Sequence, residues 1–283
     1  MIELRRLVRL VFNPDVPGGA AAPEAFTGPN GYAGKPTPRG LARFYEFEVA
    51  CRGEPDAQTG YLINIQDVDR AVRERVAPMV AEACRDRPWT DPASMIGALG
   101  EALAGALPVR LAWIRWLVTP TFSVEVAMTE HGTASDAVVI RQKFDFAAAH
   151  RLHDPNRSEA ENRALFGKCN NPNGHGHNYQ IEPAVAVRSG GNVPSRFTLA
   201  DLERLTDEAV LEAFDHTNLN LDTDAFGPGG LNPSVEHIAR VCYERLHAAI
   251  EAAGFRTEGP GVEAELRSVR VWETDRTSAT YPG

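Results

Sequence analysis

Apolar and polar residues follow the same order in the two halves of the chain. In the first half, alternation predicts four strands, at residues 2–12, 45–52, 110–118 and 122–128. Apolar residues at helical spacing predict two helices between the second and third of these strands, at residues 67–83 and 91–107. Residues 13–40 are rich in proline and glycine and are expected to form a long loop.

The second half repeats this order after a polar connector at residues 129–138. Strands are predicted at residues 139–150, 177–187, 266–273 and 278–281, and helices at residues 198–214 and 232–253. Short segments also match between the halves, such as WLVTPTFSVEV and VWETDRTSATY. We interpret the chain as an α+β protein made by tandem duplication, with one module at residues 1–128 and another at residues 139–283.

Composition and charge narrow the possible functions. The 283 residues are 43% hydrophobic and carry a net charge of −9, which argues against nonspecific nucleic-acid binding. An anionic small molecule stays possible, because a local cluster can be positive. No apolar run approaches the about 20 residues of a membrane helix. The cysteines are widely spaced, which indicates reduced thiols in a cytoplasmic protein: Cys51, Cys84, Cys169 and Cys242.

Candidate chemistry is concentrated between Lys143 and Tyr179. His150 ends an alternating strand, and His175 and His177 are two residues apart, so they share a face of a second strand. Three imidazoles on neighbouring strands would form an open zinc site with a free fourth position. Zinc is favoured over iron because no carboxylate completes the set. The alternative is a core histidine at a strand end and an HGH sequence in a solvated turn.

Cys169 lies six residues before His175 in a polar loop, beside Lys168. A neighbouring cation lowers the pKa of a thiol, so we expect a reactive group within reach of the metal's open side. An unreactive loop cysteine is the alternative.

Asp215, His216 and Glu273 are weaker candidates by spacing alone. An Asp-His pair can act as a proton relay, although at a helix end it is often a surface cap. Glu273 continues the apolar face of Val269 and Val271, so it lies either at the rim or buried against a ligand with paired donors.

The first module lacks these groups. No histidine precedes His131, so the first module cannot build a site of three histidines. Aligning the last hairpins places Val118 at the position of Glu273.

The second module resembles the 6-pyruvoyl-tetrahydropterin synthase family, including its bacterial 6-carboxytetrahydropterin synthase members. The matching segments are FDFAAAHRLH, ENRALFGKCNNPNGHGHNY, FDHTNLNLD, NPSVEHIA and VRVWETD. The long loop in this module and the spacing within CNNPNGHGHNY are closer to those of the pyruvoyl enzymes than to those of the carboxy enzymes. The first module is more faintly similar, and it keeps the family's Asp-x-x-Thr-Gly turn as Asp56, Thr59 and Gly60.

The resemblance implies roles for these residues. His150, His175 and His177 would bind Zn²⁺, Cys169 would be the general base, and Asp215 and His216 would complete its relay. Glu273 would anchor the pterin ring of 7,8-dihydroneopterin triphosphate. Lys168, Arg151 and Arg163 are candidates near the triphosphate by their proximity in sequence.

The implied reaction is loss of triphosphate to give 6-pyruvoyl-tetrahydropterin. Two alternatives stay open: the 6-carboxy product of queuosine and deazapurine biosynthesis, with release of a two-carbon fragment, and a non-catalytic zinc-stabilised assembly module.

The resemblance also implies the tunnelling (T-fold) module, a four-stranded antiparallel sheet with two helices packed on one face. In this family, subunits assemble into stacked barrels with active sites between them. Three tandem chains would supply six modules, so we expect a homotrimer with three competent sites and no nucleic-acid or membrane partner. A tetramer of paired modules, as in related tandem folds, is the alternative.

Overall fold

The computed structural model describes residues 1–13, 38, 40–188, 195–259 and 261–282. The long loop predicted at 13–40 lies almost wholly outside these residues. The chain divides into two compact units. Unit 1 comprises Met1–Ile140 with Arg188–Ser195, and unit 2 comprises Arg141–Val187 with Arg196–Gly283. The boundary falls within strand β5 (Ala134–Gln142).

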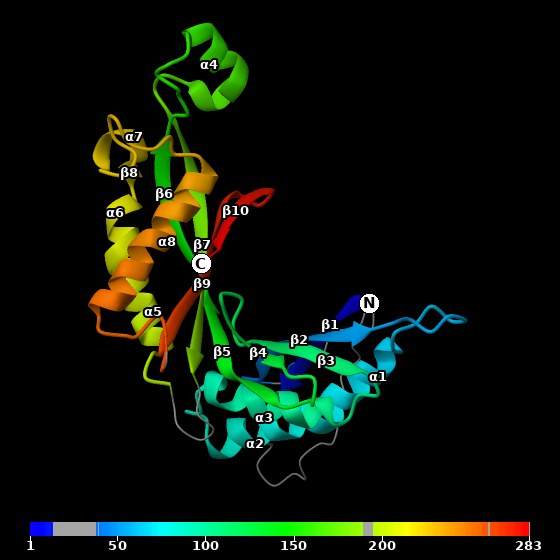
Figure 1. Cartoon of the computed structure of the whole chain (residues 1–283). Helices are drawn as coiled ribbons and strands as arrows, with labels where there is room; N and C mark the ends of the chain where they lie inside the picture. The colour runs from blue at the N-terminus through cyan, green and yellow to red at the C-terminus, as the bar shows by residue number, and fades with distance from the viewer. Residues whose placement is uncertain (14–37, 39, 189–194, 260, 283) are drawn as a thin grey trace. The chain divides into compact units, whose positions relative to one another are not determined.

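Unit 1 contains four antiparallel strands that pair in chain order (Figure 1). They are β1 (Ile2–Phe12), β2 (Arg43–Gly53), β3 (Arg110–Leu117) and β4 (Phe122–Met128). The predicted helix at 67–83 is a longer helical segment with a π-helical middle. Its parts are α1 (Ile65–Ala71), Val72–Val76 and α2 (Ala77–Asp86).

The second helix of unit 1, α3 (Pro92–Ala104), begins as its sequence predicts. Asp91 is the N-cap, and its side chain accepts a hydrogen bond from the backbone N–H of Ala93 at 2.9 Å. The helix packs against β3 and β4 and buries Ile96, Leu99 and Leu103 completely. This apolar contact holds the helix on the sheet.

Unit 2 has a comparable set of strands and helices (Figure 1). Its sheet contains β6 (Phe144–His150), β7 (His175–Arg188), β9 (Ala264–Thr274) and β10 (Thr277–Pro282), each antiparallel to the next. The helices are α5 (Leu199–Thr206), which continues through π-helical Asp207–Leu211 into α6 (Glu212–Phe214), and α8 (Val235–Ala252). Helix α8 packs against β9 and β10.

The sequence analysis predicted one strand at residues 139–150 and no helix between residues 150 and 177, and the structure differs on both points. The strand expected at 139–150 is broken at Lys143, and β5 begins at Ala134, inside the expected connector. The long loop between β6 and β7 contains helix α4 (Glu159–Phe166) and a 3-10 turn (Gly167–Asn170). A reciprocal capping box between Ser158 and Glu161 starts α4, and this signal is present in the sequence.

The protein is therefore of the α+β class. Duplication of one module stays an interpretation, supported by a β, β, α, α, β, β order of the main elements in both units, with α4 inserted between β6 and β7 in unit 2. No helix among the described residues has the length and apolar character needed to cross a membrane.

Candidate metal centre

The register of β6 and β7 brings the three predicted histidines to one place. His150 pairs with His175, and Ala148 pairs with His177. Paired residues of antiparallel strands project to the same face, so all three imidazoles lie on one side of the sheet. One ring nitrogen from each histidine lies within 4.8 Å of the others, and this cluster could hold a metal ion.

His150 is the buried member of the cluster, with no exposed side-chain surface. Its Nδ1 lies 2.7 Å from the carbonyl oxygen of Pro233. Because a carbonyl oxygen only accepts, Nδ1 carries the proton and the lone pair of Nε2 faces the cluster. Burial lowers the pKa of His150, which favours the same neutral form. A carbonyl behind a histidine ring is a common way to orient a metal ligand.

The other two imidazoles leave nitrogen atoms without partners. Nδ1 of His175 and Nε2 of His177 are buried with no hydrogen bond, and Nε2 of His175 lies 3.2 Å from Nε2 of His150. Burial, followed by the neighbouring His177, lowers the pKa of His175. Converging neutral nitrogens repel one another unless a proton or a cation lies between them. The donor set therefore fits a metal ion.

Glu273, near the end of β9, also reaches this cluster. Its Oε1 lies 3.4 Å from Nε2 of His150 and 3.7 Å from Nε2 of His177. Among the described residues, the group that could hold a metal ion is His150, His175 and His177, as the sequence predicted, and Glu273 is not part of it. The structure places a carboxylate in contact with two of the three histidines.

Tyr179 is a neighbour of the site that the sequence argument did not single out. Its side chain is fully buried, and its hydroxyl lies 3.3 Å from Nδ1 of His150. Burial raises the pKa of this hydroxyl, so it stays protonated. The sequence did contain a sign of this role, because Tyr179 lies two residues after His177 and therefore on the same face of β7.

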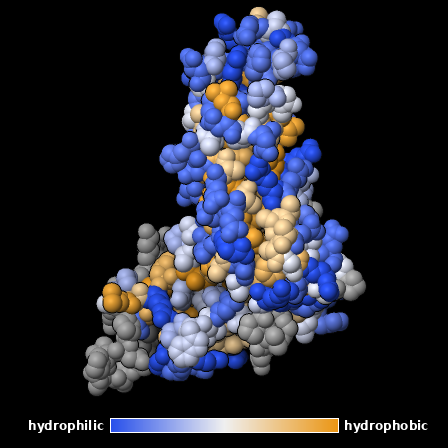
Figure 2. Space-filling view, turned by 90° about the vertical axis from the view of Figure 1, so that its left-hand side faces the viewer, coloured by the Kyte–Doolittle hydropathy of each residue, from blue (hydrophilic) through white to orange (hydrophobic). Residues whose placement is uncertain are grey.

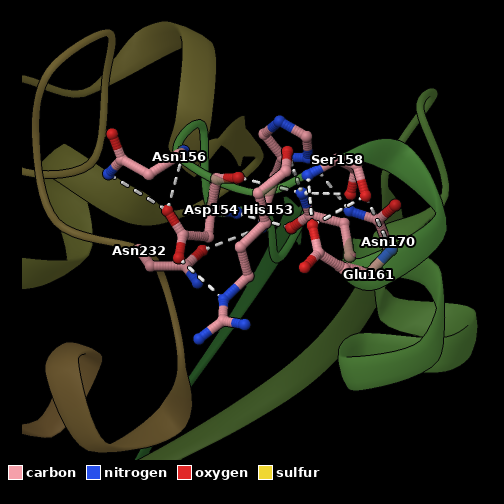
Figure 3. A network of polar contacts seen from close by, with 9 residues as sticks. His153, Asp154, Asn156, Ser158, Glu161, Asn170 and Asn232 are labelled. Carbon is pink, nitrogen blue, oxygen red and sulfur yellow. Dashed lines mark hydrogen bonds and ion pairs between the residues drawn. The ribbon is translucent and has the colours of Figure 1, made fainter.

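A polar network fixes the loop that carries Cys169 (Figure 3). Asn170 is 5% exposed and donates from Nδ2 to the carbonyl oxygen of Leu152 at 2.7 Å. The backbone N–H of His153 donates to Oδ1 of Asn232 at 3.1 Å. Asn162 is completely buried and accepts from the backbone N–H of Asp154 at 2.7 Å. The loop is thus attached both to itself and to the segment before α8.

Cys169 lies within this fixed loop and is partly buried. Its carbonyl oxygen accepts a hydrogen bond from the backbone N–H of Leu152 at 2.8 Å. Burial raises the pKa of the thiol, and the charge of Glu273 adds to the rise. The protein atoms alone therefore raise the pKa of Cys169. The sequence analysis had predicted a lowered pKa, which requires a nearby cation.

Asp215 and His216 form an ion pair at the edge of β6, where short strand β8 (Thr217–Asn218) pairs in parallel. Oδ2 of Asp215 lies 2.8 Å from Nδ1 of His216, and its Oδ1 accepts from the backbone N–H of Ala147 at 2.8 Å. These contacts lower the pKa of Asp215, with the Ala147 N–H as the main cause. His216 has a φ of 57°, an uncommon conformation for a residue with a Cβ atom.

The chain does not bring this pair to Cys169. Among the described residues, no hydrogen bond or ion pair joins Cys169 to Asp215 or His216. The His216 side chain is 83% exposed and borders the same shallow cavity as His177. The pair is therefore close to one histidine of the cluster and open to solvent.

Comparison with known proteins identifies a family for this part of the chain. Residues 139–283 match the model of the family described as 6-pyruvoyl tetrahydropterin synthase. The chain is similar to human 6-pyruvoyl tetrahydrobiopterin synthase, with 34% identity over 155 residues, which are 55% of this chain and 98% of the human protein. A Pongo abelii protein of the same name is 33% identical over 144 residues, covering 51% of this chain and 90% of that protein.

Among solved structures, the Caenorhabditis elegans 6-pyruvoyl tetrahydropterin synthase is 33% identical. The match covers 52% of this chain and 96% of that chain, with a TM-score of 0.44.

Proposed function

Because this chain belongs to the 6-pyruvoyl tetrahydropterin synthase family, we propose that it is a zinc-dependent lyase acting on 7,8-dihydroneopterin triphosphate. The proposed reaction eliminates triphosphate and rearranges the side chain to give 6-pyruvoyl-tetrahydropterin. The convergence of His150, His175 and His177 is the observation that carries this proposal, since together they could hold the zinc ion that the proposed reaction would use.

The three histidines would hold zinc through one nitrogen each. Ligands of a tetrahedral zinc ion with bonds of about 2.0–2.1 Å lie about 3.3 Å apart, close to the 3.2 Å between Nε2 of His150 and Nε2 of His175. When bound, zinc would polarise the side-chain oxygens of the substrate and lower their pKa. Tyr179 and the Pro233 carbonyl hold the His150 ring from behind.

Cys169 is proposed as the general base that moves protons on the substrate side chain. Its thiol needs a nearby positive charge to ionise, because burial and Glu273 oppose ionisation. Asp215 holds His216 through their 2.8 Å contact, and the pair is proposed to take up and return the proton.

We propose that Cys169 of one chain works with Asp215 and His216 of another. The exposure of His216 and its lack of contact with Cys169 within the described chain support this arrangement. It agrees with an assembly of stacked barrels, for which we propose a homotrimer with three competent sites. The N-terminal module would be a degenerate T-fold module that completes the barrels without holding metal.

Glu273 is proposed to bind the 2-amino and N3 edge of the pterin. A carboxylate can accept two parallel hydrogen bonds from this edge. Its contact with His150 and His177 gives it a competing partner in the free protein, so substrate binding would draw it away from the histidines.

The direct test is an assay of the purified chain with 7,8-dihydroneopterin triphosphate, with products identified by mass. We expect 6-pyruvoyl-tetrahydropterin and free triphosphate. A 6-carboxy product with a released two-carbon fragment would identify a 6-carboxytetrahydropterin synthase. Bound zinc with no turnover would contradict the lyase and favour an assembly module.

A further inference from the structure

Two basic side chains border one cavity beside the histidine cluster. Arg163, on α4, and Lys168, in the 3-10 turn, line a cavity of about 560 Å³ that also includes His175. The end of unit 2 that carries α4, at the top of Figure 2, is predominantly hydrophilic in that view, with only isolated hydrophobic residues. The cavity thus lies in polar surroundings next to a proposed metal ligand.

The backbone turn after α4 explains why these two side chains share a cavity. Gly167 ends the helix with φ 56° and ψ −123°, a conformation that a residue with a Cβ atom avoids. The chain reverses there, so Lys168 returns towards the helix that carries Arg163. Two residues later, Asn170 attaches the turn to the carbonyl oxygen of Leu152. The two cations are therefore presented by a fixed part of the loop.

Neither charge is balanced by a neighbouring group. Within the described ranges, the side chains of Arg163 and Lys168 make no hydrogen bond or ion pair. The one acidic residue of the cavity, Glu159, lies 3.6 Å from Nη2 of Arg151, which partly offsets its charge. Two unpaired cations facing one cavity favour an anion.

Arg151, the third basic residue near the cluster, reaches Glu159 but does not itself line the cavity of Arg163 and Lys168. It borders a separate cavity of about 920 Å³, which does not include any of the three histidines. Arg151 follows His150 directly, and neighbouring residues of an extended chain project to opposite sides. The sequence analysis grouped Arg151, Arg163 and Lys168 by their proximity along the chain. In the structure, Arg163 and Lys168 line one cavity and Arg151 lines another.

We propose that Arg163 and Lys168 hold the triphosphate group of the substrate in the cavity beside His175. This inference rests on the proposed function. A substrate whose side chain lies at the histidine cluster has its triphosphate a few bonds away, and His175 links the two places. Arg163 and Lys168 are binding residues here, and the reacting bonds lie at the cluster.

The test measures binding of inorganic triphosphate to the full, metal-loaded chain by calorimetry, with metal content checked afterwards because triphosphate chelates zinc. Arg163→Gln and Lys168→Gln are each expected to weaken binding about tenfold or more, as loss of a charge-assisted contact does. The matched control is Arg240→Gln, which removes the same charge from an exposed pair with Glu244 on α8. It is expected to bind triphosphate like the wild type.

Turnover provides the second measurement. In Arg163→Gln and Lys168→Gln, KM for 7,8-dihydroneopterin triphosphate is expected to rise more than kcat falls. Wild-type triphosphate affinity in both variants, or a loss confined to Arg151→Gln, would overturn the proposal and assign the anion to the other cavity. A wild-type chain that binds triphosphate through Arg163 and Lys168 but converts no pterin would contradict the lyase and leave this anion site standing.

Discussion

The two units have a similar arrangement of strands and helices, but they differ in the side chains that cluster on their sheets. In unit 1, Tyr45 lies between Phe12 and Trp116, with ring centroids 5.6 and 5.1 Å apart. In unit 2, the three histidine rings lie 4.6 to 5.1 Å from one another. The same kind of sheet therefore supports an aromatic cluster in one unit and a cluster of imidazole rings in the other.

The two clusters are expected to affect the stability of their units in opposite directions. Aromatic rings in contact stabilise the sheet by burial and edge-to-face packing. Buried imidazole nitrogens without partners destabilise it, because each has lost its hydrogen bonds to water. We therefore expect the stability of unit 2 to depend in part on what the histidines bind.

The largest effect is expected from Cys169→Ala, which removes the proposed general base from unit 2 and leaves all three histidines in place. Turnover should fall by about 10²- to 10⁴-fold, the usual contribution of general acid–base catalysis, while metal content stays unchanged. Cys84→Ala, which removes a partly exposed thiol from unit 1, is the matched control and should keep activity. Retained turnover in Cys169→Ala would remove this thiol from the mechanism.

Removing the metal with a chelator should affect the units unequally. A ligand present at a thousand times its dissociation constant stabilises the state that binds it by about 4 kcal/mol. Amide hydrogen exchange should therefore become faster in β6 and β7 after chelation and stay the same in β1 and β2. Equal changes in both units would show that the metal does not act through unit 2 alone.

The sharing of a site between chains can be tested by mixing variants. His216→Ala should lower turnover less than Cys169→Ala does, because it removes a group that supports the base. If the two residues act from different chains, mixed assemblies of Cys169→Ala and His216→Ala contain some sites with both groups intact and regain part of the activity. Mixtures as inactive as the two variants alone would place both groups in one chain.

The smallest effect is expected from Asp91→Ala in unit 1. Loss of this N-cap should lower the free energy of unfolding of unit 1 by about 1 kcal/mol. Metal content and turnover should not change, since α3 contributes nothing to the histidine cluster. A loss of metal from this variant, measured beside its thermal unfolding, would contradict the independence of the two units.

Periodicity predicted most of the fold and the centre of the site. The alternation around His150 and the two-residue spacing of His175 and His177 were enough to place three histidines together, because strand geometry fixes which residues share a face. Helix α4 was missed because only Asn162 of its residues is buried, so it has no apolar stripe and begins on its capping box alone.

Contacts between distant segments could not be read from the sequence. Glu273 reaches the histidines only through the pairing of β9 with β7, and the carbonyl of Pro233 reaches His150 from the start of α8. Spacing along one strand carries none of this information.

We propose that the histidine cluster of unit 2 is the metal site and that unit 1 holds no metal. Elemental analysis of the purified chain and of His177→Ala tests it most directly, with His247→Ala, a histidine of α8 outside the cluster, as the control. We expect one zinc ion per wild-type chain and per His247→Ala chain, and almost none in His177→Ala. Two ions per wild-type chain, or a full complement in His177→Ala, would contradict it.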